Sequence, residues 1–185
     1  MSRTPDSRPV GWRVGECLWS PQLKEDGSRW GFWETMLAVK RGDVVFHLCG
    51  ESGEASFTGY SIADDDGQPV GQGPTGPEEL YRVVLRDHTP FENPIIWESI
   101  RQSQKEALLA YFKENKSKKP IAKERLFYVL QSDRLQCLNG AYLSFLSDRL
   151  VEILFGFHTN TTTAEVVVQT SAPVGTALRS AAVRV

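Results

Sequence analysis

The sequence predicts an α+β fold in which a small, strongly curved, mostly antiparallel sheet or barrel is flanked by helices. Three observations predict it. The alternating apolar segments are short, the central ones are joined by hairpin-like connections, and a few stretches have helical spacing. The coarse order is β-α-β-β-β-α-β-α. This order is typical neither of a doubly wound parallel sheet nor of an all-helical bundle.

The first half of the chain contains most of the predicted strands. Residues 15–19 (GECLW) alternate and predict a first strand, and 33–39 (WETMLAV) have apolar residues at helical spacing. Residues 44–48 (VVFHL) and 56–63 (SFTGYSIA) predict a hairpin around a glycine-containing loop. Gly59 inside the returning strand indicates a bulge or a close approach of two backbones.

The second half mixes helices, strands and loops. Asn followed by Pro is a good helix start, because Asn caps the helix and proline suits its first position. Gly156 is placed to close the last helix. The predicted segments are a long Gly/Pro-rich loop over 64–79, a strand over 80–86, a helix from Asn93 to about Asn115, a basic loop over 116–123, a strand over 126–130, a loop over 131–140, and a helix from Ser147 or Asp148 to Phe155.

The predicted domain organisation is an arm, one globular domain and a tail. Residues 1–14 are polar with two prolines and predict a loose arm, and 15–158 predict the domain. Residues 159–185 have no aromatic residue and no core pattern, which predicts a linker or disordered tail towards a further effector domain. Three widely spaced cysteines, no signal peptide and no long apolar run favour a cytoplasmic protein without a membrane span.

Charge is distributed unevenly along the chain. Among 21 basic and 23 acidic residues, the segment 101–125 holds eight basic and three acidic side chains, so the rest of the chain is acidic. Such a cluster is typical of a phosphate-binding surface or of a solvated helix end with its loop, and charge alone favours neither strongly. The candidate phosphate-binding residues are Lys113, Lys116, Lys118, Lys119, Lys123 and Arg125.

No motif in the chain indicates catalysis, a metal or a cofactor. There is no phosphate loop, no nucleophile elbow and no zinc-binding signature. His47 lies in an apolar strand, where a structural histidine is expected more often than a ligand. The run Asp64-Asp65-Asp66 lacks the glutamate that ends a calcium loop, so it predicts a solvated turn. We therefore expect a binding domain without metal or cofactor rather than an enzyme.

Three of the five tryptophans, Trp19, Trp30 and Trp33, lie within 15 residues. Aromatic side chains at strand and loop ends can form a slot in which a nucleobase stacks, at about 1–3 kcal/mol per aromatic contact. A place in the core is the alternative for each of them. The group predicts that at least one lines a pocket.

These segments resemble the PUA-like superfamily, most closely its EVE and YTH-like reader domains. The resemblance lies in LWSP (18–21), WETMLAVKRGDVVFHL (33–48) and TGYSIADDD (58–66), with GDVVF (42–46) its most specific element. The later LQCLNGAYLSFLSDRLVEIL (135–154) resembles a segment of such domains fused to modification-dependent restriction enzymes. The likeness covers residues 15–156 with gaps, and the long Gly/Pro-rich loop departs from the family's pattern.

The resemblance implies a DNA-binding module that flips a modified base into an aromatic cage. Methylated or hydroxymethylated cytosine is expected ahead of N6-methyladenine, and the module would target a modification-dependent restriction enzyme whose nuclease or motor domain follows the tail. The implied pocket residues are Trp19, Ser20, Trp30, Trp33, Tyr60, Ser61, Asn139 and Tyr142. Ser20 and Ser61 have turn capping as an alternative role, and Tyr60 a place in the core.

Two other functions remain open from the sequence. An RNA-binding PUA-like module acting on tRNA or rRNA would use the same pocket and basic residues. A protein-interaction domain without a nucleic-acid partner would account better for the acidic remainder of the chain. Salt-dependent binding to nucleic acid separates this last class from the other two.

Overall fold

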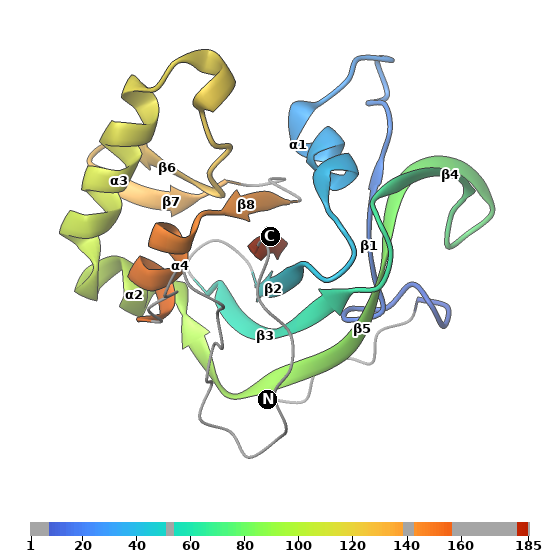
Figure 1. Ribbon diagram of the computed structural model, residues 1–185, viewed down its shortest axis with the longest axis horizontal. Coiled ribbons are helices and arrows are strands. Elements are labelled where there is room, and N and C mark those ends of the chain that lie inside the picture. The colour runs from blue at the N-terminus through green and yellow to red at the C-terminus, as the bar shows by residue number, and fades with distance from the viewer. Residues whose placement is uncertain (1–7, 51–53, 139–142, 157–180, 185) are drawn as a thin grey trace.

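The computed structural model describes residues 8–50, 54–138, 143–156 and 181–184, and we limit the description to these. They form an α+β fold in which a strongly curled, half-barrel, mostly antiparallel sheet is flanked by helices (Figure 1). The strand order is β1-β5-β3-β2-β9-β8, with β4 paired to β5, and β6 and β7 form a separate hairpin. The predicted fold class is confirmed at this level.

The strands of the sheet differ greatly in length. The main sheet contains β1 (Cys17–Pro21), β2 (Val44–Cys49), β3 (Ser56–Ala63), β4 (Gln68–Gln72), β5 (Pro77–Ile96), β8 (Ser144–Leu146) and β9 (Ala181–Arg184), and the hairpin contains β6 (Tyr128–Gln131) and β7 (Arg134–Cys137). The helices are α1 (Gly31–Glu34), α2 (Trp97–Ser103), α3 (Lys105–Ser117) and α4 (Asp148–Phe155), with 3₁₀ turns η1 (Thr35–Ala38) and η2 (Pro120–Ala122).

Strand β5 produces the curl of the sheet. Its first part pairs with β1 and β4, and its second part pairs with β3. The pairing changes partner near Asp87, whose φ of 53° is unusual for a non-glycine residue, and the register with β3 shifts between Tyr60 and Ile62. One long bent strand therefore joins the two halves of the molecule.

The β2–β3 hairpin agrees with the sequence prediction. Strand β3 has the predicted bounds, and β2 extends the predicted strand by one residue. Gly59 lies at a register shift between β3 and β5. A Cβ atom there would run into the carbonyl oxygen of Thr89 and lie 2.8 Å from the Cα of Pro90, so the expected close backbone approach is present.

Two segments predicted as loops contain strands. Strand β4 lies within 64–79 and pairs with β5, and β7 lies within 131–140 and pairs with β6. Both strands are short and mostly polar: β4 is QPVGQ and β7 is RLQC. Neither therefore shows the hydrophobic alternation that predicts a strand. Their hydrogen bonds come from partners that the local sequence does not reveal.

The start predicted for the long helix was wrong. Residues up to Ile96 continue β5, because Ile95 and Ile96 pair with Phe57 and Ser56, and the helix begins at Trp97. It is also interrupted at Gln104, which separates α2 from α3. The last helix is confirmed: the Ser147 side chain accepts a hydrogen bond from the Leu150 amide, and Gly156 ends the helix with a φ of 70°.

The other predicted elements shift by a few residues. The first strand runs from 17 to 21 rather than from 15 to 19, and the fifth from 128 to 131 rather than from 126 to 130. The predicted 33–39 helix is a short α-helix followed by a 3₁₀ turn, α1 and η1. The three-residue strand β8 was not predicted.

The two ends of the chain include parts that join the sheet. In the predicted N-terminal arm, the Glu16 carboxylate accepts hydrogen bonds from the amides of Gly11 and Arg13, and Arg82 donates to the Gly11 carbonyl. In the predicted tail, residues 181–184 form β9, which lies parallel to β2 and antiparallel to β8. Those four residues are therefore part of the sheet rather than of a linker.

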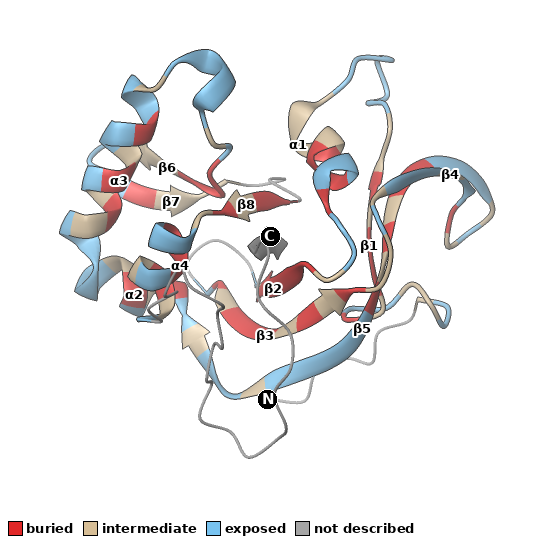
Figure 2. Cartoon of the chain, in the orientation of Figure 1, coloured by how far each residue is buried: buried red, intermediate tan, exposed pale blue. Residues whose placement is uncertain are grey.

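Two hydrophobic clusters lie on opposite sides of β2. Because side chains alternate along a strand, Val44, Phe46 and Leu48 pack in the first cluster and Val45 in the second. The first cluster includes buried residues of α2, α3, α4 and the β6–β7 hairpin, and the second joins β1 and β5 to α1 and η1. Figure 2 shows buried residues along both sides of the curl, with the middle of β5 exposed.

A cluster of ion pairs fastens α2 to the β6–β7 hairpin. Glu98 pairs with Arg101 on its own helix and lies 3.6 Å from Arg134 of β7. Hydrogen bonds from Arg101 and Gln102 lower the pKa of Glu98 to about 2. The carboxylate stays ionised well below neutral pH, so this contact holds over the whole physiological range.

The close approach at Gly59 gives a first testable prediction. We expect Gly59→Ala to lower the free energy of unfolding by about 1–3 kcal/mol, because the added methyl group meets backbone atoms that cannot rotate away. Gly71→Ala is the matched control, since a Cβ at Gly71 of β4 meets nothing within 4 Å. Urea denaturation of the two variants measures the difference, and equal stabilities would contradict the packing described here.

Candidate functional site

Trp30 and Trp33 form an aromatic pair at the start of α1. Their rings meet edge to face with centroids 5.5 Å apart, and Phe32 lies 5.8 Å from Trp30. Trp33 is buried in the second hydrophobic cluster, whereas Trp30 is only partly buried against it. The ammonium group of Lys24 lies 5.6 Å from the Trp30 ring centroid. The Trp30 ring is therefore partly accessible and packs against the buried Trp33 ring.

Ser20 adds a buried hydroxyl group on the same side of β1. Side chains alternate along a strand, so Ser20 shares a face with Leu18, which packs in the second cluster with Trp33. Ser20 is fully buried, and its Oγ has no hydrogen-bond partner among the described residues. A buried hydroxyl without a partner costs about 1–3 kcal/mol, and such a group calls for an explanation.

Leu143, which follows two further predicted pocket residues, packs in the second hydrophobic cluster. Asn139 and Tyr142 lie outside the residues that the structure describes. Leu143 follows them directly, is buried in the second cluster, and accepts a hydrogen bond of 3.0 Å from the Thr35 hydroxyl of η1. The structure therefore brings together Ser20, Trp30, Trp33 and the residue next to Tyr142.

Trp19 lies in a different environment. It points to the opposite face of β1 from Ser20, where its ring meets the edge of Trp12 at 6.3 Å. The guanidinium of Arg82 lies 4.4 Å above the Trp12 ring and donates to the Gly11 carbonyl. Trp19 therefore belongs with the N-terminal segment, and the three predicted tryptophans do not form one cage.

Tyr60 and Ser61 of β3 point to opposite faces of that strand. Tyr60 packs against the first cluster, near Phe46 and Phe91. The fully buried Ser61 hydroxyl lies 2.8 Å from His47 Nε2 and 3.1 Å from His88 Nδ1. Tyr60 therefore packs with the first cluster and Ser61 bonds to two histidines, so both residues stand apart from the α1 site in the second cluster.

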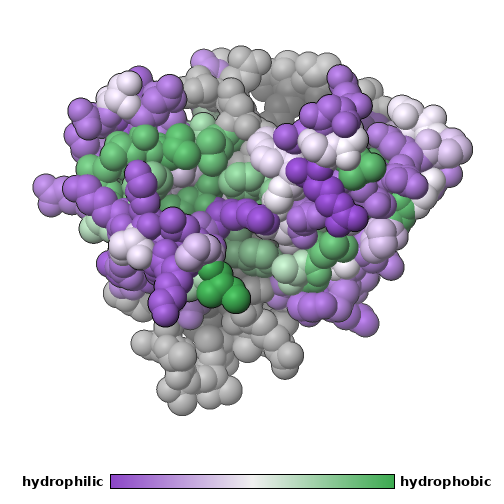
Figure 3. All heavy atoms as spheres, turned by 90° about the horizontal axis from the view of Figure 1, so that it is seen from above, coloured by the Kyte–Doolittle hydropathy of each residue, from purple (hydrophilic) through white to green (hydrophobic). Residues whose placement is uncertain are grey.

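The predicted phosphate-binding residues lie on α3 and the loop that follows it. Lys113, Lys116, Lys119, Lys123 and Arg125 are exposed, and within the described part of the chain they form no ion pair. Lys118 is the exception, since its ammonium group lies 2.8 Å from the Glu124 carboxylate. Seen from above, hydrophilic side chains cover much of this face, and hydrophobic ones gather over the half that carries α3 and the β6–β7 hairpin (Figure 3).

Arg125 connects the basic loop to the aromatic pair. Its guanidinium donates a hydrogen bond to the carbonyl oxygen of Gly31, the residue after Trp30. A Cβ at Gly31 would lie 2.6 Å from Cζ of Arg125, so the arginine packs directly on the bare backbone of α1. Arg125 therefore links the end of the basic loop to the start of α1, beside Trp30.

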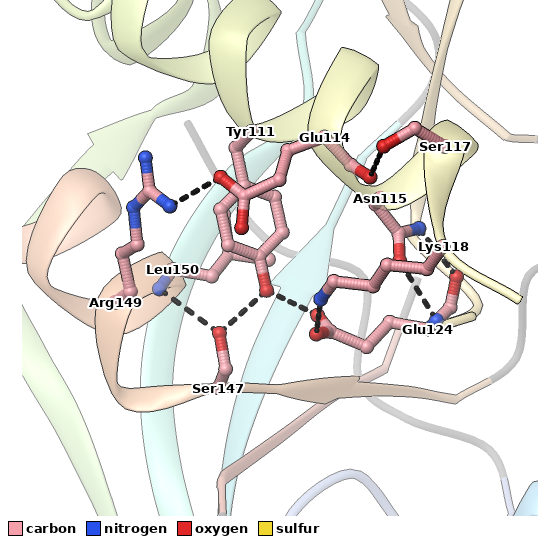
Figure 4. A network of polar contacts seen from close by, with 9 residues as sticks. All are labelled: Tyr111, Glu114, Asn115, Ser117, Lys118, Glu124, Ser147, Arg149 and Leu150. Carbon is pink, nitrogen blue, oxygen red and sulfur yellow. Dashed lines mark hydrogen bonds and ion pairs between the residues drawn. The ribbon is translucent and has the colours of Figure 1, made fainter. Parts of the chain in front are cut away.

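A polar network holds the base of the loop against two helices (Figure 4). The Tyr111 hydroxyl bonds to Glu124 and lies 2.5 Å from the Ser147 hydroxyl at the start of α4. Burial and the neighbouring Glu124 carboxylate raise the pKa of Tyr111. The Asn115 side chain donates to the Glu124 carbonyl and accepts from its amide, at 2.8 and 2.9 Å. These bonds fix the two ends of the loop at residues 115 and 124.

The three aspartates of the run 64–66 have partners within the protein. Asp64 pairs with Arg41 and Arg86. Asp65 accepts a hydrogen bond from the Val84 amide. Asp66 pairs with Lys40 and accepts a hydrogen bond from the Arg41 amide. No group of three or more His, Cys, Asp or Glu residues within the described ranges is arranged to hold a metal ion. Among the helices of those ranges, none has the length and apolar character to cross a membrane.

Sequence reasoning missed Trp12, Arg82 and Lys24. Trp12 and Arg82 meet across 70 residues of sequence, and no local pattern reveals that contact. The opposite placement of Trp19 and Ser20 had a signal, because adjacent residues of a predicted strand point to opposite faces. The only sequence signal for Lys24 was its position in a turn-rich segment between two of the tryptophans.

Comparison of the sequence with descriptions of known protein families finds no match, and comparison with curated proteins finds none either. The functional argument therefore depends on the geometry of this chain.

Two of the fully buried serines, Ser20 and Ser61, provide a matched pair of variants. We expect Ser20→Ala to leave the free energy of unfolding unchanged or higher, because it removes a hydroxyl that has no partner among the described residues. Ser61→Ala should lower it by about 1–2 kcal/mol, since it breaks bonds to two imidazoles. Thermal and urea unfolding of both variants test this, and a Ser20→Ala loss as large as that of Ser61→Ala would show that Ser20 has a structural role.

Proposed function

We propose that the chain is a DNA-binding module that recognises a modified base, with a PUA-like fold similar to EVE and YTH-like readers. In this proposal the base is methylated or hydroxymethylated cytosine, ahead of N6-methyladenine. The module itself is not an enzyme and serves as the targeting part of a modification-dependent restriction enzyme. The curled sheet with flanking helices supports the PUA-like assignment, together with the sequence resemblance.

One observation carries the proposal. A partly exposed tryptophan, a buried supporting tryptophan and a buried serine hydroxyl lie on one side of β1, and an arginine joins them to a stretch of cations without ion-pair partners among the described residues. Aromatic faces bind bases and hydroxyl groups read base edges, while cations bind phosphates. Trp30 and the cations are accessible at the surface, and Trp33 and the Ser20 hydroxyl lie buried on the same side of β1 as Trp30.

The energetics of base capture fit these groups. Extruding a base from a duplex costs a few kcal/mol, which stacking on Trp30 at about 1–3 kcal/mol and hydrogen bonds to the base edge must offset. A methyl group on the base gains further from the apolar walls that Trp33 and Leu143 provide. Since Trp19 points to the other face of β1, the proposal assigns the pocket to Trp30, Trp33 and Ser20, with Asn139 and Tyr142 as candidates from the adjoining segment.

A low-salt titration with matched duplexes tests this function. We expect the chain to prefer a duplex with 5-methylcytosine or 5-hydroxymethylcytosine over the same duplex with cytosine. Trp30→Ala should reduce that preference about tenfold or more, because it removes the stacking surface. Trp12→Ala is the matched control, another partly buried tryptophan but on the other face of β1, and should keep the preference.

The same titration separates the alternatives. Equal binding to all duplexes would contradict base reading, and a stronger preference for single-stranded RNA would favour an RNA-binding module. Loss of preference in Trp19→Ala, with Trp30→Ala unaffected, would move the pocket to the opposite face of β1. Absence of binding to every probe would favour a protein-interaction domain.

The salt dependence of binding tests the cationic surface. Each lysine that contacts a phosphate contributes about one unit to the slope of log affinity against log salt concentration. We therefore expect Lys116→Ala and Lys119→Ala each to lower the slope by about one. Lys40→Ala is the control, because Lys40 is exposed but paired with Asp66 at 2.8 Å and lies outside the basic loop. Equal slopes in all variants would remove the loop from the interface.

A further inference from the structure

The tip of the basic loop presents an isoleucine to solvent. Ile121 is 98% exposed, more than any other large hydrophobic residue that the structure describes, and Val10 follows at 76%. It lies in the 3₁₀ turn η2, which Pro120 begins, and four lysines share its loop, 116–123. Single exposed hydrophobic residues are common, so exposure alone proves nothing. The surroundings of Ile121 are what require an explanation.

The loop that carries Ile121 is held at its base. Asn115 and Glu124 close it with two hydrogen bonds, and Lys118 and Tyr111 both bond to the Glu124 carboxylate. At the tip, the Ala122 amide bonds to the Lys119 carbonyl at 2.9 Å. A side chain presented on a fixed loop loses less conformational entropy on binding than one on a free chain. The loop is therefore organised to hold an apolar group away from the body of the protein.

The charges of the loop favour a polyanionic partner. The two acidic residues nearest the loop in sequence are already paired: Glu114 with Arg149 and Glu124 with Lys118. Lys116, Lys119 and Lys123, which share the loop with Ile121, have no ion pair with any residue of the described ranges. Their repulsion is unfavourable in the free chain and is relieved when phosphates bind.

The loop lies next to the proposed base-binding surface. Arg125, directly after the loop base, donates to Gly31 beside Trp30. In Figure 1 the loop after α3 and the segment leading into α1 both lie at the top of the view, on its left and right sides. A duplex that offers one base to Trp30 would therefore bring its neighbouring steps towards the loop.

We propose that the loop 116–123 is a wedge that inserts Ile121 into the base stack of a DNA duplex beside the captured nucleotide, while Lys116, Lys119 and Lys123 bind the flanking phosphates. The proposal rests on the DNA-binding function above and adds a second contact to it. Apolar side chains that enter base steps unstack them at a cost of a few kcal/mol, and an extruded base leaves a gap that such a side chain fills. Ile121 then stabilises the duplex in the form that the pocket requires.

Fluorescence of 2-aminopurine tests the wedge. The fluorophore is placed next to 5-methylcytosine in one duplex and next to cytosine in a matched one, because its emission rises when the stack opens. With the wild-type chain we expect the emission to rise on binding. Ile121→Ala should remove most of that rise and weaken binding about tenfold, as expected for the loss of a buried aliphatic side chain. Val10→Ala, the next most exposed apolar residue, should change neither quantity.

The readouts separate failure of the wedge from failure of base reading. Base reading is measured by the affinity ratio of the two duplexes, and the wedge by the Ile121-dependent emission and affinity. If the ratio is retained while Ile121→Ala behaves as wild type, the wedge is overturned and base reading stands. If the ratio is one but Ile121→Ala still weakens binding and emission on both duplexes, base reading fails and the wedge stands. Tighter Ile121-dependent binding to vesicles with anionic lipid than to either duplex would overturn the wedge in favour of a membrane contact.

Discussion

Strand β5 is bent, and its two sections pair with different strands. This pairing determines where the other elements of the molecule lie. The first section of β5 holds β1, and through it the second hydrophobic cluster with Ser20 and Trp33. Its second section holds β3 and leads directly into α2, which packs in the first cluster. The bend near Asp87 turns the two sections relative to each other, so the aromatic site and the helices of the first cluster belong to different sections of the strand.

Arg125 connects these two parts of the molecule through a hydrogen bond. The guanidinium reaches from the segment after α3 to the Gly31 carbonyl at the start of α1. The contact requires an accessible carbonyl at the beginning of a short helix and a residue without a side chain there, and Gly31 provides both. The network around Glu124 then fixes the other end, because Tyr111, Asn115 and Lys118 all bond to that residue. The basic loop is thereby held against α1, although the residues that flank the loop pack in the first cluster and the tryptophans in the second.

The sequence predicted those parts of the fold that local physics determines. The β2–β3 hairpin follows from alternation and β-branched residues, and α4 follows from the Ser147 cap and Gly156. It could not predict β4 and β7, whose polar residues become strands only because β5 and β6 offer hydrogen-bonding edges. It also misplaced the start of the helix after β5. The Asn93-Pro94 step is a good local helix start, but pairing of Ile95 and Ile96 with β3 outweighs it. For the site, residue type drew attention to Trp30, Trp33 and Ser20, which the structure brings to one side of β1. The surroundings of Trp19 depend instead on a contact between Trp12 and Arg82 that no local pattern reveals.

Two unfavourable features of the free chain occur on one surface. The Ser20 hydroxyl is buried without a partner among the described residues, at a cost of about 1–3 kcal/mol, although an alanine would fit the same space. The lysines around Ile121 repel one another, and the nearest acids are engaged elsewhere. Features that lower stability and have no structural benefit are typical of sites whose interactions are completed by a ligand. In the proposed function a nucleic acid completes both at once, since a base edge supplies the hydrogen bond that Ser20 lacks and the phosphates neutralise the loop. A partner that satisfied only one of them would leave the other cost unexplained, and this is the physical reason why the proposal treats the aromatic pair and the basic loop as one interface.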